Sequence, residues 1–229
     1  MANSIFAELD TDDDDPRNFF NNFSTCKCLY LEENKLNDFL HSDNGSRMNI
    51  MHVNCRSMNK NFKSLTNLLH RISEPMTAIG ITETWLNSNH EFFCNITGYK
   101  FVTNSRVNRP GGGVGLYINN FLDSEVCKEL TIMQDHIESI FVEIKQQGVS
   151  NIMIGCIYRP PNTDVTLFNT EMSNVLDILG SKYKGPAFLL GDFNLDLIHS
   201  ASHVPTGEFF SSMIAHSFFS NHLLSNANN

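Results

Sequence analysis

The 229-residue sequence contains no apolar run that approaches 18 residues, so it predicts no membrane-spanning helix. The start of the chain, Met1–Glu8, lacks a basic segment followed by an apolar core, which argues against a secretory signal peptide. Basic residues are also in short supply, since 16 Lys and Arg stand against 25 Asp and Glu. The formal net charge of −9 argues against a generic basic nucleic-acid-binding protein. It does not exclude an enzyme that binds phosphates through a metal held by carboxylates.

The six cysteines have no spacing typical of a zinc site. Cys26 and Cys28 are separated by one residue, and no second pair follows. Cysteines scattered through apolar runs are typical of free thiols in a reducing compartment, with disulfide bonds as the alternative. We therefore expect an intracellular protein, nuclear or cytoplasmic, that is neither secreted nor bound to a membrane.

The negative charge is concentrated in the first fifth of the chain. Residues 1–47 hold 10 acidic and 4 basic residues, a net charge of −6, whereas residues 48–229 hold 15 and 12. The tract Asp12–Asp15 repels itself and is followed by Pro16, which breaks helices. We predict a largely disordered acidic leader over 1–47 and a folded domain over 48–229. A short helix within 29–40 and a metal-binding aspartate tract remain alternatives for the leader.

Hydrophobic periodicity from residue 49 onward predicts more strands than helices. Strands are expected over 49–54, 76–81, 99–103, 113–118, 139–145, 151–158 and 186–191, and helices over 58–72, 164–180 and 206–216. Hairpin connections alternate with longer crossovers. This order favours an α/β sandwich of two sheets covered by helices over a doubly wound parallel sheet.

Polar side chains follow the first two predicted strands. Asn54 offers an amide oxygen as a metal ligand, and Arg56 can grip a phosphate with two hydrogen bonds. Glu83 ends the second strand beside Trp85, the only tryptophan, where burial of a carboxylate is costly unless a cation pairs with it. Taken singly, Asn54 also fits an ordinary turn residue, and Glu83 also fits an ordinary surface residue.

Two later strands end in the same way. Tyr158 heads the segment Tyr158-Arg159-Pro160-Pro161, where a phenol can donate to a phosphate oxygen or simply pack before a rigid turn. Asp192 and Asn194 follow three apolar residues and a glycine, at alternate positions of an extended segment. A carboxylate and an amide placed together suit the binding and deprotonation of a water molecule.

The glycine-rich stretch Gly111–Gly115 invites comparison with a dinucleotide-binding loop. No helical pattern follows it, because the next residues continue a strand. We therefore favour a closely packed hairpin over a nucleotide cradle.

In chain order, five short motifs occur together: the first strand with Asn54, Thr82-Glu83-Thr84-Trp85, the Gly111–Gly115 hairpin, Tyr158-Arg159-Pro160-Pro161, and Gly191-Asp192-Phe193-Asn194. This set resembles the exonuclease–endonuclease–phosphatase superfamily. It is most similar to the endonuclease domains that open the replicase of non-LTR retrotransposons. The resemblance implies a four-layer α/β sandwich that cleaves DNA phosphodiester bonds with Mg²⁺, or Mn²⁺ as an alternative.

The resemblance also implies roles for individual residues. Glu83 would be the main metal ligand with Asn54 in the metal shell, and Arg56 would support the phosphate. In a full-length relative, a reverse transcriptase domain would follow.

The remaining implied roles concern the water and the phosphate. Asp192, assisted by Asn194, would orient or deprotonate the attacking water, while Tyr158 would hydrogen-bond the scissile phosphate.

One family feature is missing from this sequence. The family domain ends with a Ser-Asp-His strand, and no such triplet follows Asn194. The pair Asp135-His136 precedes Asp192 and is expected to be a loop. We therefore expect a domain that lacks its last strands. Alternatives to an active nuclease are an inactive fragment that binds DNA or a protein, and an enzyme acting on a small phosphate ester.

Overall fold

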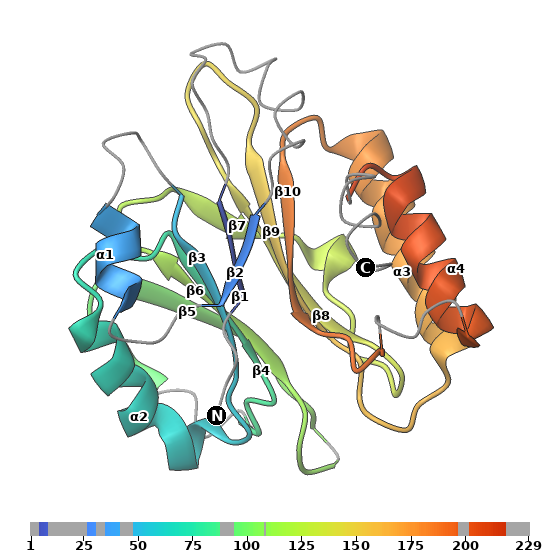
Figure 1. Cartoon of the computed structure of the whole chain (residues 1–229), viewed down its shortest axis with the longest axis horizontal. Coiled ribbons are helices and arrows are strands. Elements are labelled where there is room, and N and C mark those ends of the chain that lie inside the picture. The colour runs from blue at the N-terminus through green and yellow to red at the C-terminus, as the bar shows by residue number, and fades with distance from the viewer. Residues whose placement is uncertain are drawn as a thin grey trace.

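The structure is a computed structural model that describes residues 5–8, 27–30, 35–41, 48–87, 94–107, 109–196 and 202–218. Two four-stranded mixed sheets lie face to face with helices on their outer sides (Figure 1). The first sheet has the order β3-β4-β6-β5, formed by Ile50–Asn54, Ala78–Thr82, Val114–Asn119 and Tyr99–Asn104. The second has the order β10-β9-β8-β7, formed by Ala187–Asp192, Ile152–Tyr158, Glu138–Ile144 and Ser124–Val126.

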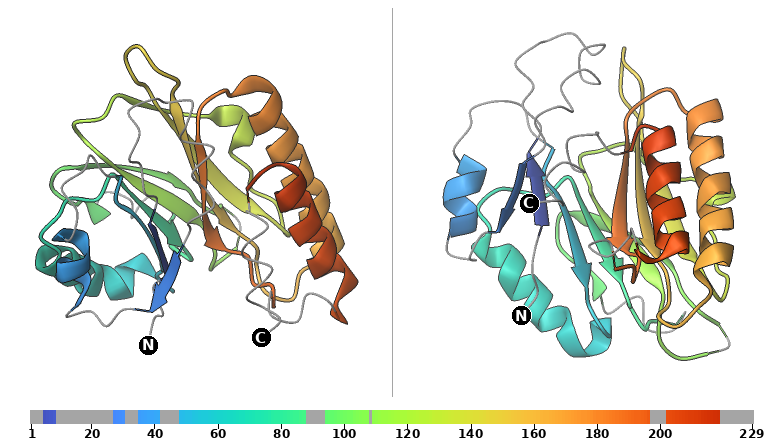
Figure 2. Two further views of the ribbon diagram at one scale, coloured as in Figure 1. Left: turned by 45° about the horizontal axis from the view of Figure 1, so that its top comes forward. Right: turned by 45° about the vertical axis from the view of Figure 1, so that its right-hand side comes forward.

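Helices complete a four-layer sandwich. Helices α1 (Leu36–His41) and α2 (Met58–Arg71) cover the first sheet, and α3 (Val165–Lys182) and α4 (Val204–Ala215) cover the second (Figure 2). A 3-10 turn, η4 (Lys128–Leu130), follows β7, and β1 (Ile5–Glu8) pairs antiparallel with β2 (Lys27–Tyr30). None of the helices in the described ranges combines the length and the apolar character that a membrane crossing needs.

Strand alternation builds the inner layers. In β8, Ile140, Val142 and Ile144 enter the core between the two sheets, whereas Phe141 points the other way into the core beneath α3 and α4. A third core lies between the first sheet and α2. Both sheets are thus covered on both faces, which explains why β4, β8 and β9 are buried along almost their whole length.

The predicted fold class is confirmed. Each of the seven predicted strands and three predicted helices has a counterpart within a few residues of its expected bounds. Strand β7 and turn η4 were not predicted, because three-residue elements carry no measurable period. The parallel pairs β3–β4 and β9–β10 are each joined by a helical crossover, and the other pairs within these two sheets are antiparallel.

The predicted leader contributes at least one element to the core. Helix α1 coincides with the end of the short helix that was an alternative there, and its Leu36 and Leu40 are buried with Met51 and Leu65. The aspartate tract at 12–15 lies outside the described residues. The boundary at residue 47 stays a prediction.

The cysteines whose side chains are described are all buried free thiols. They are Cys55, Cys94, Cys127 and Cys156. No disulfide joins any of these four, as expected for scattered cysteines in apolar segments.

Two glycines offer a matched test of the packing. A β-carbon on Gly155 would lie 2.2 Å from the buried ring of Phe141, whereas one on Gly180, inside α3, would meet nothing within 4 Å. We expect Gly155→Ala to lower the free energy of unfolding by about 1–3 kcal/mol through overpacking. Gly180→Ala should raise it by about 0.5–1 kcal/mol, because alanine restricts the unfolded chain. Urea unfolding of both variants checks the pair, and equal effects would contradict the packing described here.

Candidate active site

The strand register brings the polar strand ends into two rows. In the first sheet Asn54 stands opposite Thr82, the last residue of β4. In the second sheet Tyr158 stands between Glu138 and Asp192. A hydrogen bond from Asn54 to Asp192 joins the rows, so the two sheets present their polar ends at one common edge.

The Asn54 side chain links the two predicted carboxylates. Its Nδ2 donates to Glu83 Oε1 at 2.9 Å and to Asp192 Oδ2 at 2.7 Å. Glu83 follows the first sheet and Asp192 ends a strand of the second, so each sheet supplies one carboxylate. Asn54 is exposed and both carboxylate residues are half-buried, which leaves the cluster open to solvent.

The loops that carry these residues are held in left-handed conformations. Of seven non-glycine residues with positive φ in the described ranges, five lie at this edge. They are Arg56 (φ 43°), Ser57 (93°), Glu83 (53°), Trp85 (52°) and Asn194 (48°). Such conformations are costly for side-chain-bearing residues and are typical of functional sites that the surrounding structure holds in place.

Backbone hydrogen bonds supply that support. The loop after β3 donates from Ser57 N to Glu83 O at 2.9 Å and from Met58 N to Thr84 O at 2.8 Å. Thr84 N in turn donates to Gly113 O at 3.1 Å. A β-carbon on Gly113, whose φ is +83°, would lie 2.4 Å from Thr84 Oγ1, so only glycine fits there. The predicted glycine hairpin is present, and β6 follows it rather than a helix.

Tyr158 lies beneath the carboxylates and is 4% exposed. Burial raises the pKa of its phenol to about 12, and the nearby negative charges of Glu83, Glu138 and Asp192 add to the shift. The phenol therefore keeps its proton at neutral pH. Its hydroxyl has no hydrogen-bond partner within the described part of the chain, so it is available to donate to a ligand.

Asn194 is placed beside Asp192 by a turn rather than by the extended segment expected from the sequence. Strand β10 ends at Asp192, and Asn194 N donates back to Asp192 Oδ1 at 3.1 Å. One N–H of the Asn194 amide donates to Arg159 O at 2.8 Å. The second N–H and the amide oxygen are left for other partners, so the side chain can still donate to a water and accept from it.

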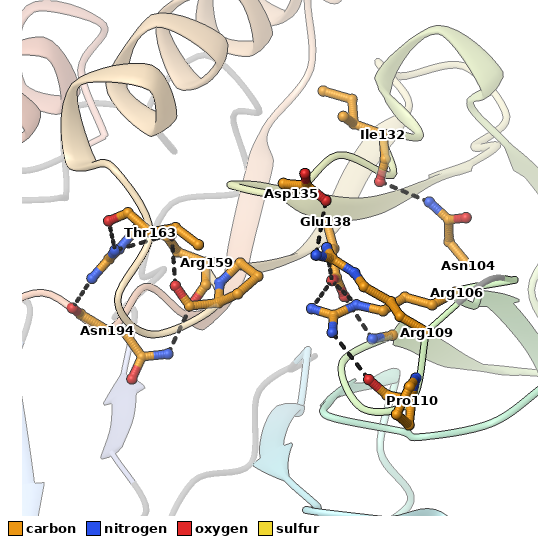
Figure 3. A network of polar contacts seen from close by, with 12 residues as sticks. Asn104, Arg106, Arg109, Pro110, Ile132, Asp135, Glu138, Arg159, Thr163 and Asn194 are labelled. Carbon is orange, nitrogen blue, oxygen red and sulfur yellow. Dashed lines mark hydrogen bonds and ion pairs between the residues drawn. The ribbon is translucent and has the colours of Figure 1, made fainter.

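Arg159 fixes this turn from below. Its guanidinium donates to Phe193 O at 2.7 Å, to Thr163 O at 2.9 Å and to Asn194 O (Figure 3). Burial lowers the pKa of Arg159, yet an arginine remains charged at neutral pH. Arg159 belongs to the motif Tyr158-Arg159-Pro160-Pro161, but the sequence indicated no role for it. A buried guanidinium that binds three backbone carbonyls is a structural anchor for Asp192.

Glu138 was also missed. Its side chain is fully buried and accepts from Gly113 N at 2.5 Å and from the Arg106 guanidinium, which crosses from the other sheet (Figure 3). Burial raises the pKa of Glu138, opposed by the Gly113 amide and Arg106. The argument used for Glu83 applies here too, because Glu138 is an acidic residue at one end of a buried strand.

The remaining predicted residues are not gathered at the cluster. Arg56 is exposed, and its side chain forms no hydrogen bond or ion pair with the described residues. Asp135 forms an ion pair with Arg109 at 2.8 Å, and the pair Asp135-His136 lies in a bend, as expected. None of the histidines that follow Asn194 was predicted as a site residue. His203 lies 2.8 Å from Thr206 Oγ1 and His216 lies 3.1 Å from Asp177 Oδ1, while His199 and His222 lie outside the described residues.

The donor set suits a hard divalent cation. Glu83 and Asp192 offer carboxylate oxygens, and rotation of the Asn54 amide would turn its oxygen toward the same point. Mg²⁺ is commonly bound by one or two carboxylates and several waters. Across the described ranges no cluster of three or more His, Cys, Asp or Glu side chains could hold a metal, so a metal here would have at most two of these side chains as ligands.

No protein-family model and no curated protein matches the sequence, but solved structures match the fold. AP endonuclease LMAP from Leishmania major is 16% identical with a TM-score of 0.53, over 74% of this chain and 66% of that one. The 3' phosphatase NExo from Neisseria, bound to a product DNA hairpin, is 15% identical with a TM-score of 0.52, over 74% and 71%. D. rerio TDP2, complexed with a single-strand DNA product, is 14% identical with a TM-score of 0.52, over 71% and 66%.

These three proteins belong to the exonuclease–endonuclease–phosphatase superfamily, and the chain has the fold of that superfamily. It spans 66% of the length of two of them, just under two thirds.

The half-buried His52 at the site predicts a pH effect on stability. His52 Nε2 lies 3.1 Å from Thr82 Oγ1, and burial lowers the pKa of His52 to about 4, partly opposed by Asp192. Below about pH 6.5 the unfolded chain takes up a proton that the folded chain refuses until about pH 4. The free energy of unfolding should therefore fall over this window as pH falls, by about 2–3 kcal/mol.

The variant His52→Gln keeps a hydrogen-bonding group near Thr82 but cannot titrate. Urea unfolding between pH 4 and 7.5 should show a shallower pH dependence for this variant than for the wild type. Parallel profiles would contradict the assignment.

Proposed function

We propose that this protein is a metal-dependent phosphodiesterase of the exonuclease–endonuclease–phosphatase superfamily that nicks DNA. One observation carries the proposal: Glu83 and Asp192, from different sheets, converge on the exposed amide of Asn54. Two carboxylates are held together in this way at an accessible edge, above a buried phenol. This arrangement suits hydrolysis of a phosphate ester better than a purely structural role.

In this proposal Glu83 and Asn54 bind Mg²⁺, or Mn²⁺ in its place. A bound divalent ion supplies electrostatic stabilisation of the charge that develops on the phosphate and the leaving oxygen. Arg56, exposed at the same edge, is assigned to the phosphate of the substrate. Its exposed guanidinium would bind only a substrate that extends over the loop after β3.

Asp192 is the residue that we propose orients and deprotonates the water. One of its oxygens accepts from Asn194 N at 3.1 Å and the other from Asn54, so the carboxylate has a fixed direction. Tyr158, which keeps its proton, donates to a non-bridging phosphate oxygen. Preorganised donors of this kind are effective because they need no reorganisation as charge develops.

DNA is the proposed substrate, and two of the matched structures are described with DNA products. The motif set most resembles retrotransposon endonuclease domains, so we propose target-site nicking within the cell and a reverse transcriptase domain as partner in a longer relative. The acidic leader at 1–47 and a domain from 48 onward remain part of this proposal.

The alternative is a fragment that binds DNA without cleaving it. The observation in its favour is that no Ser-Asp-His triplet follows Asn194 in the sequence. Loss of one preorganised contact to the transition state can reduce a rate by roughly 10²–10³-fold. This alternative predicts salt-sensitive DNA binding with no turnover.

Plasmid nicking separates these proposals. Purified protein should relax supercoiled plasmid with Mg²⁺, and Glu83→Gln or Asp192→Asn should each reduce the rate by at least about 10²-fold. Both replacements keep the side-chain shape and remove the charge. The control is Glu125→Gln, an exposed carboxylate beside Lys145 at the opposite end of the second sheet, which should nick at the wild-type rate. Equal nicking by all variants would contradict the site, and DNA binding without nicking by the wild type would favour the inactive fragment.

A further inference from the structure

A cavity lies beside the candidate active site. It has a volume of about 430 Å³ and is lined by residues from three loops at the same sheet edge. Ser57 comes from the loop after β3, Trp85 and Asn87 from the loop after β4, and Arg106, Arg109 and Gly111 from the β5–β6 loop. We call this cavity the side pocket. None of the residues assigned to metal, water or phosphate above lines it.

Trp85 forms an exposed aromatic wall of the side pocket. It is 40% exposed, although large aromatic side chains usually gain by burial. Its φ of 52° is unusual for a bulky residue, and Trp85 N is held by Gly112 O at 2.8 Å. A β-carbon on Gly111 would lie 3.8 Å from the indole Nε1, so the glycine loop runs close along the ring. A strained backbone that keeps an indole at a pocket wall suits the stacking of a planar ligand.

The two arginines of the side pocket differ in how firmly they are held. Arg106 is 11% exposed and is paired with the buried carboxylate of Glu138. Arg109 is 42% exposed, and its firm partner is Asp135, which is 88% exposed (Figure 3). Its other guanidinium nitrogen lies 3.9 Å from Glu138. A solvent-exposed ion pair contributes little, so Arg109 can exchange Asp135 for a phosphate, which a guanidinium binds with two parallel hydrogen bonds.

The side pocket is directly linked to the candidate active site. Ser57 N donates to Glu83 O at 2.9 Å, and Trp85 follows Glu83 by two residues. Two residues span at most about 7 Å, which is close to one nucleotide step of an extended strand. The volume is at the small end of the range for ligand sites, which favours one nucleotide over a duplex.

We propose that the side pocket binds one nucleotide of a DNA strand, adjacent to the scissile phosphate, with its base against Trp85 and its phosphate on Arg109. The inference rests on the proposed function, because it assigns a subsite to the same substrate. It requires the base to leave the stack of a duplex or to come from a single strand.

The experiment uses the fact that Trp85 is the only tryptophan in the sequence. Its intrinsic fluorescence therefore reports on the side pocket alone. The full-length chain is titrated with a short single-stranded oligodeoxythymidylate in EDTA, so that no metal-dependent cleavage occurs. We expect quenching that saturates, whereas an abasic oligonucleotide of equal length should bind without quenching. Thymidine monophosphate, which has the same base and phosphate, should bind much more weakly than the strand.

Variants test the two assigned side chains. By anisotropy of a labelled strand, Trp85→Ala should weaken binding by about five- to a hundredfold, and Trp85→Phe, which keeps an aromatic face, should restore most of it. Arg109→Ala should weaken binding and lower the slope of log affinity against log salt by about 0.7–1. The matched control is Lys145→Ala: this cation is 45% exposed, pairs with an exposed acid and follows the far end of β8. It should leave the affinity and the salt slope unchanged.

The outcomes separate this inference from the proposed function. Any one of four results would overturn the side-pocket assignment. They are no quenching, equal quenching by the abasic strand, binding of the mononucleotide only, and equal losses of binding affinity in Arg109→Ala and Lys145→Ala. Plasmid nicking by a chain with such a result would leave the nuclease proposal intact. Conversely, the expected quenching in a wild-type chain that does not nick would leave the pocket assigned and the nuclease proposal refuted.

Discussion

The hydrogen bonds of the Asn54 amide are the interaction on which the candidate site depends. Asn54 joins Glu83, 29 residues away, and Asp192, 138 residues away, and each carboxylate comes from a different sheet. Two like charges this close repel each other unless a donor or a cation lies between them. The Asn54 amide supplies that donor, and a divalent cation would offset the repulsion between the two carboxylates more strongly. The meeting of the two sheets at this edge is therefore a chemical requirement as well as a packing result.

The rest of the edge keeps this arrangement rigid. Arg159 anchors the turn after Asp192. Glu138, in β8 of the second sheet, anchors Arg106 and Gly113 of the β5–β6 loop, which belongs to the first sheet. Both are buried charges whose hydrogen bonds are made to backbone or to an opposite charge, which is the condition for tolerating a charge inside a protein. The left-handed residues at the loop starts are retained because these bonds fix the loops on both sides.

Much of the fold could be predicted because it follows from periodicity. Short apolar runs mark β8 and β9, and the 3.6-residue period marks α3, whose Phe168, Met172 and Val175 are buried as a single face. Short elements such as β7 could not be predicted, because three residues do not establish a period. Helix α1 lies in an acidic segment, and only its tertiary contacts show that Leu36 and Leu40 reach the core.

The candidate site was predictable only in part. Asn54, Glu83, Tyr158 and Asp192 could be proposed because polar groups at the ends of apolar strands are conspicuous, and the structure places them at one edge. The turn at Asn194 could not be read from alternation, because it depends on Arg159.

Glu138 and Arg106 were missed because their pairing joins strands from different sheets. The side pocket likewise exists only where three loops meet, and no single segment of sequence encodes it.

The central claim is that Glu83, with Asn54 in the metal shell, binds a divalent cation beside Asp192. Titration of Mn²⁺ into the full chain, followed by electron paramagnetic resonance of the free ion, tests it most directly. We predict one bound ion per chain, with the affinity reduced at least about tenfold in Glu83→Gln and unchanged in Glu125→Gln. Binding that Glu83→Gln weakens no more than Glu125→Gln does would contradict the claim.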